Sequence, residues 1–258
     1  MWRAEWLRFW AELRFYRQMW IGNLINQVLI TAGFFWVVSL LSQATLSGLL
    51  ALFFWQYVSI PLSKISTDIW EESTSGAFEQ MYLHAAQPAW VLVVRLLNYL
   101  LQQTVVALPL FLGMALLFGF SLTDFLSYNW GGMLLTLGIS LAGFIGLGLA
   151  MGGILLIYRN AIIYRNAIGY ANALEYLLLF LSGAVVPLSQ LPAFIQPLAW
   201  GLPLSLGIET IRRLENGGQW ELTLMALVVQ SVFMLVFGLA LFNHCLRRAL
   251  RRGFAMSR

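Results

Sequence analysis

The stretch Trp70–Trp90, with the sequence WEESTSGAFEQMYLHAAQPAW, decides the organisation of this chain, because it is a polar interval between two long apolar runs. It carries three acidic residues, Glu71, Glu72 and Glu79. Both flanking runs are apolar enough to lie in a membrane. We therefore expect this stretch to lie in water against one membrane face.

A short helix is expected over about 76–86 of this stretch. Ser75 or Gly76 can cap its start, and Pro88 disfavours helical geometry at Gln87. Four side chains recur at helical spacing and form one apolar face: Phe78, Met81, Tyr82 and Ala85. Such a face either enters a groove of a partner protein or packs on the membrane surface and on the chain's own loops.

The composition is that of a polytopic membrane protein. Of 258 residues, 60% are hydrophobic and 10% are charged, and mean hydropathy is +0.77. Soluble domains carry about 25% charged residues. The sequence predicts one all-α membrane domain over 1–258, in contact with membrane lipid. The net charge of +4 is a topology signal rather than a sign of nucleic-acid binding.

Six membrane spans are expected, because each apolar run is long enough to cross about 30 Å of hydrocarbon. Spans one and two lie within 20–68, spans three to five within 89–187, and span six at 221–243. The six runs are 20–41, 47–68, 89–118, 130–157, 166–187 and 221–243.

The remaining segments have distinct patterns. Residues 1–18 alternate aromatic and basic side chains, which predicts an amphipathic helix at the membrane interface. The stretch 70–88 is the loop described above. Residues 188–220 are broken by prolines and predict short extracellular helices or a re-entrant hairpin. Residues 244–258 form a basic tail.

Basic residues orient the spans. With six spans both termini lie on one side, and that side receives thirteen of the fifteen Lys and Arg residues. The other side receives Arg212 and Arg213 only. The positive-inside rule then places both termini, the 70–90 loop and the tandem repeat IYRNAI-IYRNAI at 157–168 in the cytoplasm. The expected location is the plasma membrane, which in a bacterium is the inner membrane.

The sequence lacks the residues that several kinds of active or binding site require. The single lysine, Lys64, lies in Pro-Leu-Ser-Lys-Ile, so the chain has no Walker A loop and no ATP site of its own. His84 and His244 are far apart in sequence, and Cys245 is the only thiol, so no metal site or cofactor is expected. Intramembrane serine proteolysis is disfavoured, because the histidines and Ser182 fall near opposite faces. We expect the chain not to be an enzyme.

Polar residues within the spans are candidates for a translocation pathway, with hydrogen bonding between helices as the alternative role. Glu175 is the costliest of them to bury; it can pair with Arg165, line a cavity or lie at a subunit interface. The candidates are Asn23, Asn26, Gln27, Asn98, Gln102, Asn172 and Glu175. Eight glycines in 130–157 predict close helix packing.

Two sequence segments resemble the membrane subunits of ABC-2 type ABC transporters. In the first, an acidic pair precedes a Gly, a Glu and an apolar residue, read here as Glu71-Glu72-Ser-Thr-Ser-Gly76-Ala-Phe78-Glu79-Gln-Met81. His84-Ala85 replaces the family's usual Ser-Pro. The second is Phe180-Leu181-Ser182-Gly183 followed by Pro187, Leu191, Pro192, Pro197, Pro203 and Arg212. The layout of an interface helix, six spans and cytoplasmic termini is also similar.

The resemblance implies an exporter with two ATP-binding subunits, which carry Mg-ATP, and a second membrane subunit. The helix at 76–86 becomes a coupling helix seated in the ATPase. The coupling residues implied are Glu71, Glu72, Gly76, Phe78, Glu79, Met81 and Tyr82. The extracellular gate implied is Ser182, Gly183, Pro187 and Pro192.

Substrate and assembly are left open by the sequence. The aromatic spans suit a hydrophobic or amphipathic cargo, such as a drug, lipid or glycolipid, and suit plain lipid contact equally. Homodimer and heterodimer are both compatible with the sequence. The alternative function is a stand-alone secondary transporter or channel, which needs no ATPase.

Overall fold

A computed structural model describes residues 10, 14–15, 17–41, 45–75, 88–157, 173 and 175–251, and these residues are helices and short connections without a strand. Ordered along the chain, the helices are α2 (Arg17–Leu41), α3 (Leu46–Ser75), α5 (Pro88–Leu117), α6 (Leu122–Ser127), α7 (Trp130–Ile157), η1 (Leu188–Gln190), α9 (Gln196–Trp200), α10 (Pro203–Glu215) and α11 (Glu221–Arg251). Residues 175–181 are also helical.

Four helices are long and apolar enough to cross a membrane, and they agree with the predicted spans two, three, four and six. Their apolar segments are Leu46–Ile69, Trp90–Leu117, Trp130–Ile157 and Glu221–Ala249. Helix α2, at the predicted first span, contains a shorter apolar segment, Leu24–Val37. Of the predicted fifth span 166–187, residues 166–172 and 174 lie outside the described residues, and 175–181 are helical. Most of the interface helix at 1–18 and all of 158–172 also lie outside them. The six-span count stays a prediction.

Two helices continue beyond the predicted spans. The span predicted at 47–68 agrees with the apolar segment Leu46–Ile69, and α3 continues at least to Ser75, the last described residue there. Ser75 is helical, so it is not the N-cap of a separate helix. The segment 67–75 contains no Gly or Pro to stop it. Helix α11 was expected to end at 243 and continues to Arg251, because Cys245 and Leu246 bury one face of its last turns.

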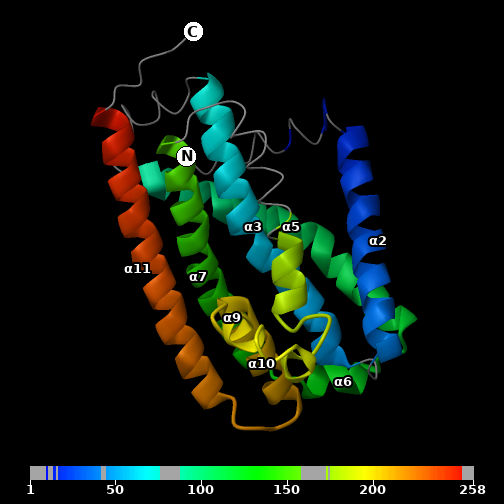
Figure 1. Cartoon of the computed structure of the whole chain (residues 1–258). Helices are drawn as coiled ribbons and strands as arrows, with labels where there is room; N and C mark the ends of the chain where they lie inside the picture. The colour runs from blue at the N-terminus through cyan, green and yellow to red at the C-terminus, as the bar shows by residue number, and fades with distance from the viewer. Residues whose placement is uncertain are drawn as a thin grey trace.

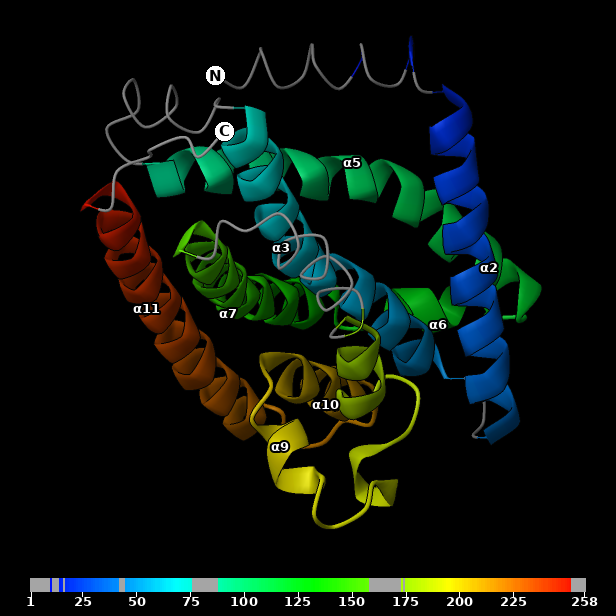
Figure 2. The same ribbon diagram turned by 45° about the horizontal axis from the view of Figure 1, so that its top comes forward.

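Helix α3 is the centre of the fold. Of its most apolar segment 83% is buried, whereas the corresponding segments of α5 and α11 are 22% and 17% buried and face outward. Figures 1 and 2 show α3 passing between α2 and α5 on one side and α7 on the other, with α11 alongside α7. The core therefore follows α3, and its largest fully buried side chains include Phe35, Phe54 and Phe144.

The predicted close packing of α7 is confirmed. A Cβ added at Gly146 would lie 2.2 Å from the backbone oxygen of Met234, and one at Gly148 would lie 2.4 Å from that of Pro61. Glycine thus lets α7 touch the backbones of α11 and α3 on two of its faces.

The short helices cluster at one end of the molecule. Helix α10 lies across α3, α7 and α11 and buries Leu204, Ile208 and Ile211. Helix α6, which the sequence analysis did not predict, is capped by Ser121: the Ser121 hydroxyl accepts from the Asp124 N–H, and the Asp124 carboxylate accepts from the Ser121 N–H. The predicted short helices of 188–220 are present as η1, α9 and α10.

Candidate functional site

A cluster of neutral polar side chains joins three helices within the apolar body of the molecule. The amides of Gln27 on α2 and Gln103 on α5 both donate to the Gln56 Oε1 on α3, over 3.0 and 3.4 Å. The Gln56 amide donates in turn to the hydroxyl of Thr31, and that hydroxyl donates to the Gln27 backbone oxygen over 2.8 Å. These four residues are called the glutamine cluster below.

Gln56 holds the glutamine cluster together, and the sequence analysis missed it. It is 8% exposed and lies in the run Phe53-Phe54-Trp55-Gln56-Tyr57. A lone amide among large apolar residues of a membrane helix needs hydrogen-bond partners on other helices, which was the available signal. Next to it, the Tyr57 hydroxyl donates to the Thr104 hydroxyl over 2.9 Å, a second polar link from α3 to α5.

Replacing Gln56 with Leu should loosen α2, because Gln27 and Gln103 each lose their acceptor there. Hydrogen bonds between membrane helices contribute about 0.6 kcal/mol on average and up to about 1.7 kcal/mol. We expect Gln56→Leu to lower the free energy of unfolding in bicelles by about 1–2 kcal/mol. Gln102→Leu is the matched control, since Gln102 lies outside the cluster; equal losses in both variants would contradict this role of Gln56.

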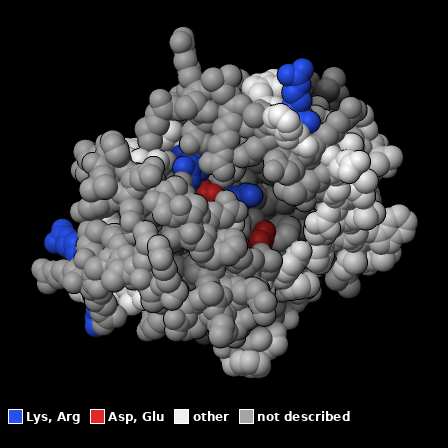
Figure 3. Space-filling model, turned by 90° about the horizontal axis from the view of Figure 1, so that it is seen from above, with Lys and Arg blue, Asp and Glu red and all other residues white. Residues whose placement is uncertain are grey.

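A group of charged side chains lies near the C-terminal end of α3, far from α10. Arg95 on α5 and Asp68 on α3 form an ion pair with 3.5 Å between Nη1 and Oδ2, and their side chains are 10% and 9% exposed. The Tyr99 hydroxyl donates to Asp68 over 3.1 Å, and the Lys64 Nζ lies 5.2 Å from the centre of the Tyr99 ring. Viewed from the end where α2 begins and α11 ends, acidic and basic side chains lie close together near the middle of this face (Figure 3).

Glu175, the acidic residue singled out in the sequence, packs against α3. The Trp55 indole N–H donates to the Glu175 backbone oxygen over 3.1 Å. The Glu175 carboxylate interacts with the Ser59 hydroxyl and with the charge of Lys64. Its predicted partner Arg165 lies outside the described residues. Glu175 therefore packs against the middle of α3, beside Trp55.

The other pathway candidates have different positions. Gln27 enters the glutamine cluster, Asn98 is buried between helices, and Gln102 is half-buried. Asn26 is exposed. Asn172 and the side chain of Asn23 lie outside the described part of the structure.

The predicted gate residues lie beside α10. Ser182 is buried, and its hydroxyl donates to the Leu179 backbone oxygen over 3.0 Å. Gly183 has φ 85°, and its backbone oxygen accepts a hydrogen bond from Arg212. Pro187 lines a cavity of about 580 Å³ that Arg212 also lines, whereas Pro192 is exposed. Arg212 thus ties the predicted gate to α10.

Of the predicted coupling residues, Glu71 and Glu72 belong to the last turns of α3. Their side chains lie outside what the structure describes, as do the whole of Gly76, Phe78, Glu79, Met81 and Tyr82. Their predicted contact with an ATPase stays a prediction.

Within the described residues, no group of three or more His, Cys, Asp or Glu side chains is placed to hold a metal ion. Comparison of the chain with protein-family models and with curated proteins gives no match.

Proposed function

We propose that this chain is the membrane subunit of an ATP-driven exporter of the ABC-2 type, and that it moves a hydrophobic or amphipathic substrate across the plasma membrane. One observation carries the proposal: polar side chains recur along α3 from Gln56 to Asp68. A helix of 30 residues is about 45 Å long, which is enough to cross the bilayer with its head groups.

The polar series on α3 has two parts. In the middle of the helix, Gln56 holds the glutamine cluster. Beyond it, Lys64 interacts with Glu175, and Asp68 pairs with Arg95. Polar and ionisable groups are costly in membrane helices and commonly mark a substrate path.

A separate ATPase supplies the energy in this proposal, because the sequence has no Walker A loop. Two ATPase subunits bind Mg-ATP, and two membrane subunits pair in the inner membrane with both termini in the cytoplasm. ATP-driven closure of the ATPases pushes on the coupling helix at 76–86. Because that helix follows directly on α3, its displacement is transmitted to the polar series.

Helix α2 is the part of the described fold best suited to move. It contacts α3 and α5 over a small area compared with the contact between α7 and α11, and Ile25, Leu29 and Leu40 on α2 are exposed. Neutral amide hydrogen bonds in the glutamine cluster connect it to α3. Separation of α2 from α3 opens the polar face of α3 to substrate in this proposal.

The decisive test is replacement of both Phe78 and Tyr82 by Ala in the assembled transporter. We expect the pair of substitutions to abolish the stimulation of ATP hydrolysis by substrate, because the anchors in the ATPase groove are lost. ATPase activity and transport are measured in proteoliposomes, after co-purification has identified the ATPase.

Gln80→Ala is the control for this test, since residue 80 falls on the opposite side of a helix from 78 and 82. Transport at the normal rate in the double variant, with the ATPase still bound, contradicts the coupling role. A chain that co-purifies with no ATPase contradicts the proposed function itself.

A stand-alone secondary transporter is the second candidate. It is favoured by the ionisable side chains of Asp68, Arg95 and Glu175, since ion-coupled transporters use such groups within their spans. Proteoliposomes that hold this chain alone distinguish the two: uptake driven by an imposed ion gradient supports the secondary transporter, and uptake only with ATP and the ATPase supports the exporter.

A further inference from the structure

The cavity beside the predicted gate is polar and charged, unlike the helices around it. It has a volume of about 580 Å³ and lies where the start of α3, the segment around η1, α9 and α10 meet. The residues that line it include Gln196, Trp200, Glu209, Arg212, Arg213 and Glu215. A volume of this size is typical of a site for a small molecule.

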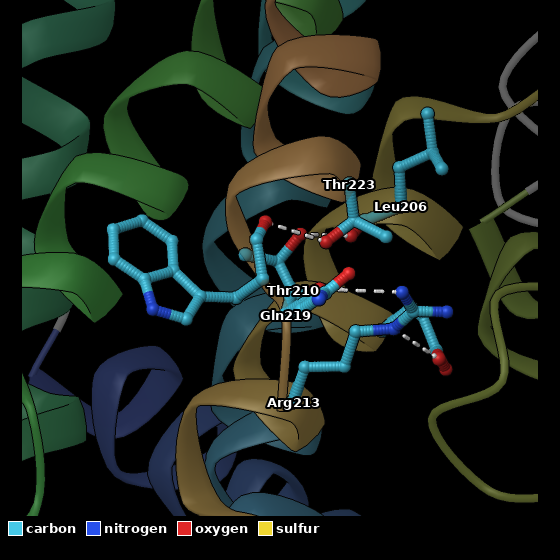
Figure 4. A network of polar contacts seen from close by, with 7 residues as sticks. Leu206, Thr210, Arg213, Gln219 and Thr223 are labelled. Carbon is cyan, nitrogen blue, oxygen red and sulfur yellow. Dashed lines mark hydrogen bonds and ion pairs between the residues drawn. The ribbon is translucent and has the colours of Figure 1, made fainter. Parts of the chain in front are cut away.

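The charged side chains of the cavity are fixed by the protein's own groups. Arg213 Nε donates to Glu209 Oε1 over 2.9 Å, and its Nη1 donates to the Gln219 backbone oxygen over 3.3 Å, so the guanidinium is held between α10 and the turn before α11 (Figure 4). Arg212 donates to the Gly183 oxygen. Glu215 accepts from the Ser47 N–H. A ligand therefore meets a preformed arrangement.

The charges of the cavity balance, with two guanidinium groups and two carboxylates. Burial lowers the pKa of Arg212, while Glu209 and Glu215 oppose that shift, so each cation has an anion near it. A phosphate that enters the cavity loses its hydration and is repelled by the two carboxylates, which offsets its attraction to the arginines. A cation is repelled by the two arginines in the same way. The balance favours a ligand without net charge.

The donors and acceptors match hydroxyl groups. Carboxylate oxygens accept from hydroxyls, guanidinium and Gln196 amide groups donate to them, and the indole of Trp200, 39% exposed, offers an apolar ring face. A second cavity of about 450 Å³ shares Thr45 and Glu215 with the first and is lined in addition by the rings of Phe118 and Phe120. An aromatic surface beside a polar site suits an amphipathic molecule.

We propose that the cavity between α9 and α10 binds a neutral, hydroxyl-rich group, either a free glycoside or the glycosyl head group of a lipid. The binding itself requires only this chain, and only the identification of that ligand as exported cargo rests on the proposed function. A glycosyl group in this site stacks on Trp200 and donates its hydroxyl protons to Glu209 and Glu215.

The test uses the purified full chain in nanodiscs of phosphatidylcholine. Methyl β-maltoside is the neutral soluble probe, and glycerol 1-phosphate is a charged probe that also carries hydroxyl groups. Binding is measured by saturation-transfer NMR. We expect saturation of the maltoside and not of the phosphate. Trp200→Ala and Glu209→Gln are each expected to weaken maltoside binding about fivefold or more, the loss of one good contact.

Gln190→Ala is the matched control, because Gln190 is exposed on η1 and does not line the cavity. It should bind maltoside as the native chain does, and thermal denaturation checks that all variants are folded. Equal saturation of both probes, or normal maltoside binding by folded Trp200→Ala and Glu209→Gln, overturns the proposal.

Nanodiscs that contain a diglucosyl diacylglycerol distinguish the two sources of the ligand. Competition of this lipid with methyl β-maltoside assigns the cavity to lipid head groups, and binding of maltoside without competition assigns it to soluble glycosides. Because no ATPase is present, failure of this test leaves the coupling experiment with Phe78 and Tyr82 unaffected.

Discussion

Gly238→Ala is expected to destabilise the protein more than any other single methyl group added in the described helices. A Cβ at Gly238 would lie 1.9 Å from the backbone oxygen of Gly146, closer than any van der Waals contact allows. The obstacle is backbone on both sides, so no rotamer change relieves it, and α7 and α11 must separate. Overpacking typically costs about 1–3 kcal/mol, and a backbone obstacle places this change at the upper end of that range.

The measurement is the free energy of unfolding in bicelles, compared with Gly138→Ala. Gly138 is exposed on α7, and a Cβ there meets nothing within 4 Å. Because Ala is favoured over Gly in a helix by roughly 0.5–1 kcal/mol, this control should be neutral or stabilising. If both variants have the same stability, α7 and α11 do not approach each other at Gly146 and Gly238.

Asp68→Ala is expected to have the second large effect, because it leaves the buried charge of Arg95 without its carboxylate. Removing one member of a buried ion pair costs about 3–5 kcal/mol. Changing both residues, Asp68→Ala with Arg95→Met, should cost clearly less than the sum of the single changes, since the two charges that interact with each other are removed together. The four free energies of unfolding form a double-mutant cycle that measures the coupling.

The pair Arg213–Glu209 provides the contrast, with side chains 38% and 24% exposed. Exposed pairs one helical turn apart contribute about 0.3–0.5 kcal/mol, so Glu209→Ala should change stability by less than about 1 kcal/mol. Additive effects of Asp68→Ala and Arg95→Met would show that the two side chains do not interact.

Long apolar runs were the clearest signal in the sequence. The predicted span 130–157 coincides with α7, and 89–118 differs from α5 by one residue at each end. The predicted span 47–68 agrees with the apolar segment Leu46–Ile69, and α3 continues past it because its polar turns 67–75 contain no Gly or Pro. Helix α6 has six residues and little apolar periodicity, so its capping box was the only signal.

The candidate site was predictable only in part, for a physical reason. Gln27 could be singled out from the sequence as a polar residue within the first predicted span. Its acceptor, Gln56, lies 29 residues away on a helix that is otherwise apolar. The cavity beside α10 combines side chains from four separate segments, and no pattern within one segment encodes that assembly.

The contact between α7 and α11 also has a consequence for biogenesis. The glycines at 143, 146 and 153 of α7 fit against α11, which is the last helix of the described fold to leave the ribosome. Until residues beyond 221 have been synthesised, these glycines of α7 have no α11 backbone against them. The closest helix contact of the described fold can therefore form only after the last described helix has been added.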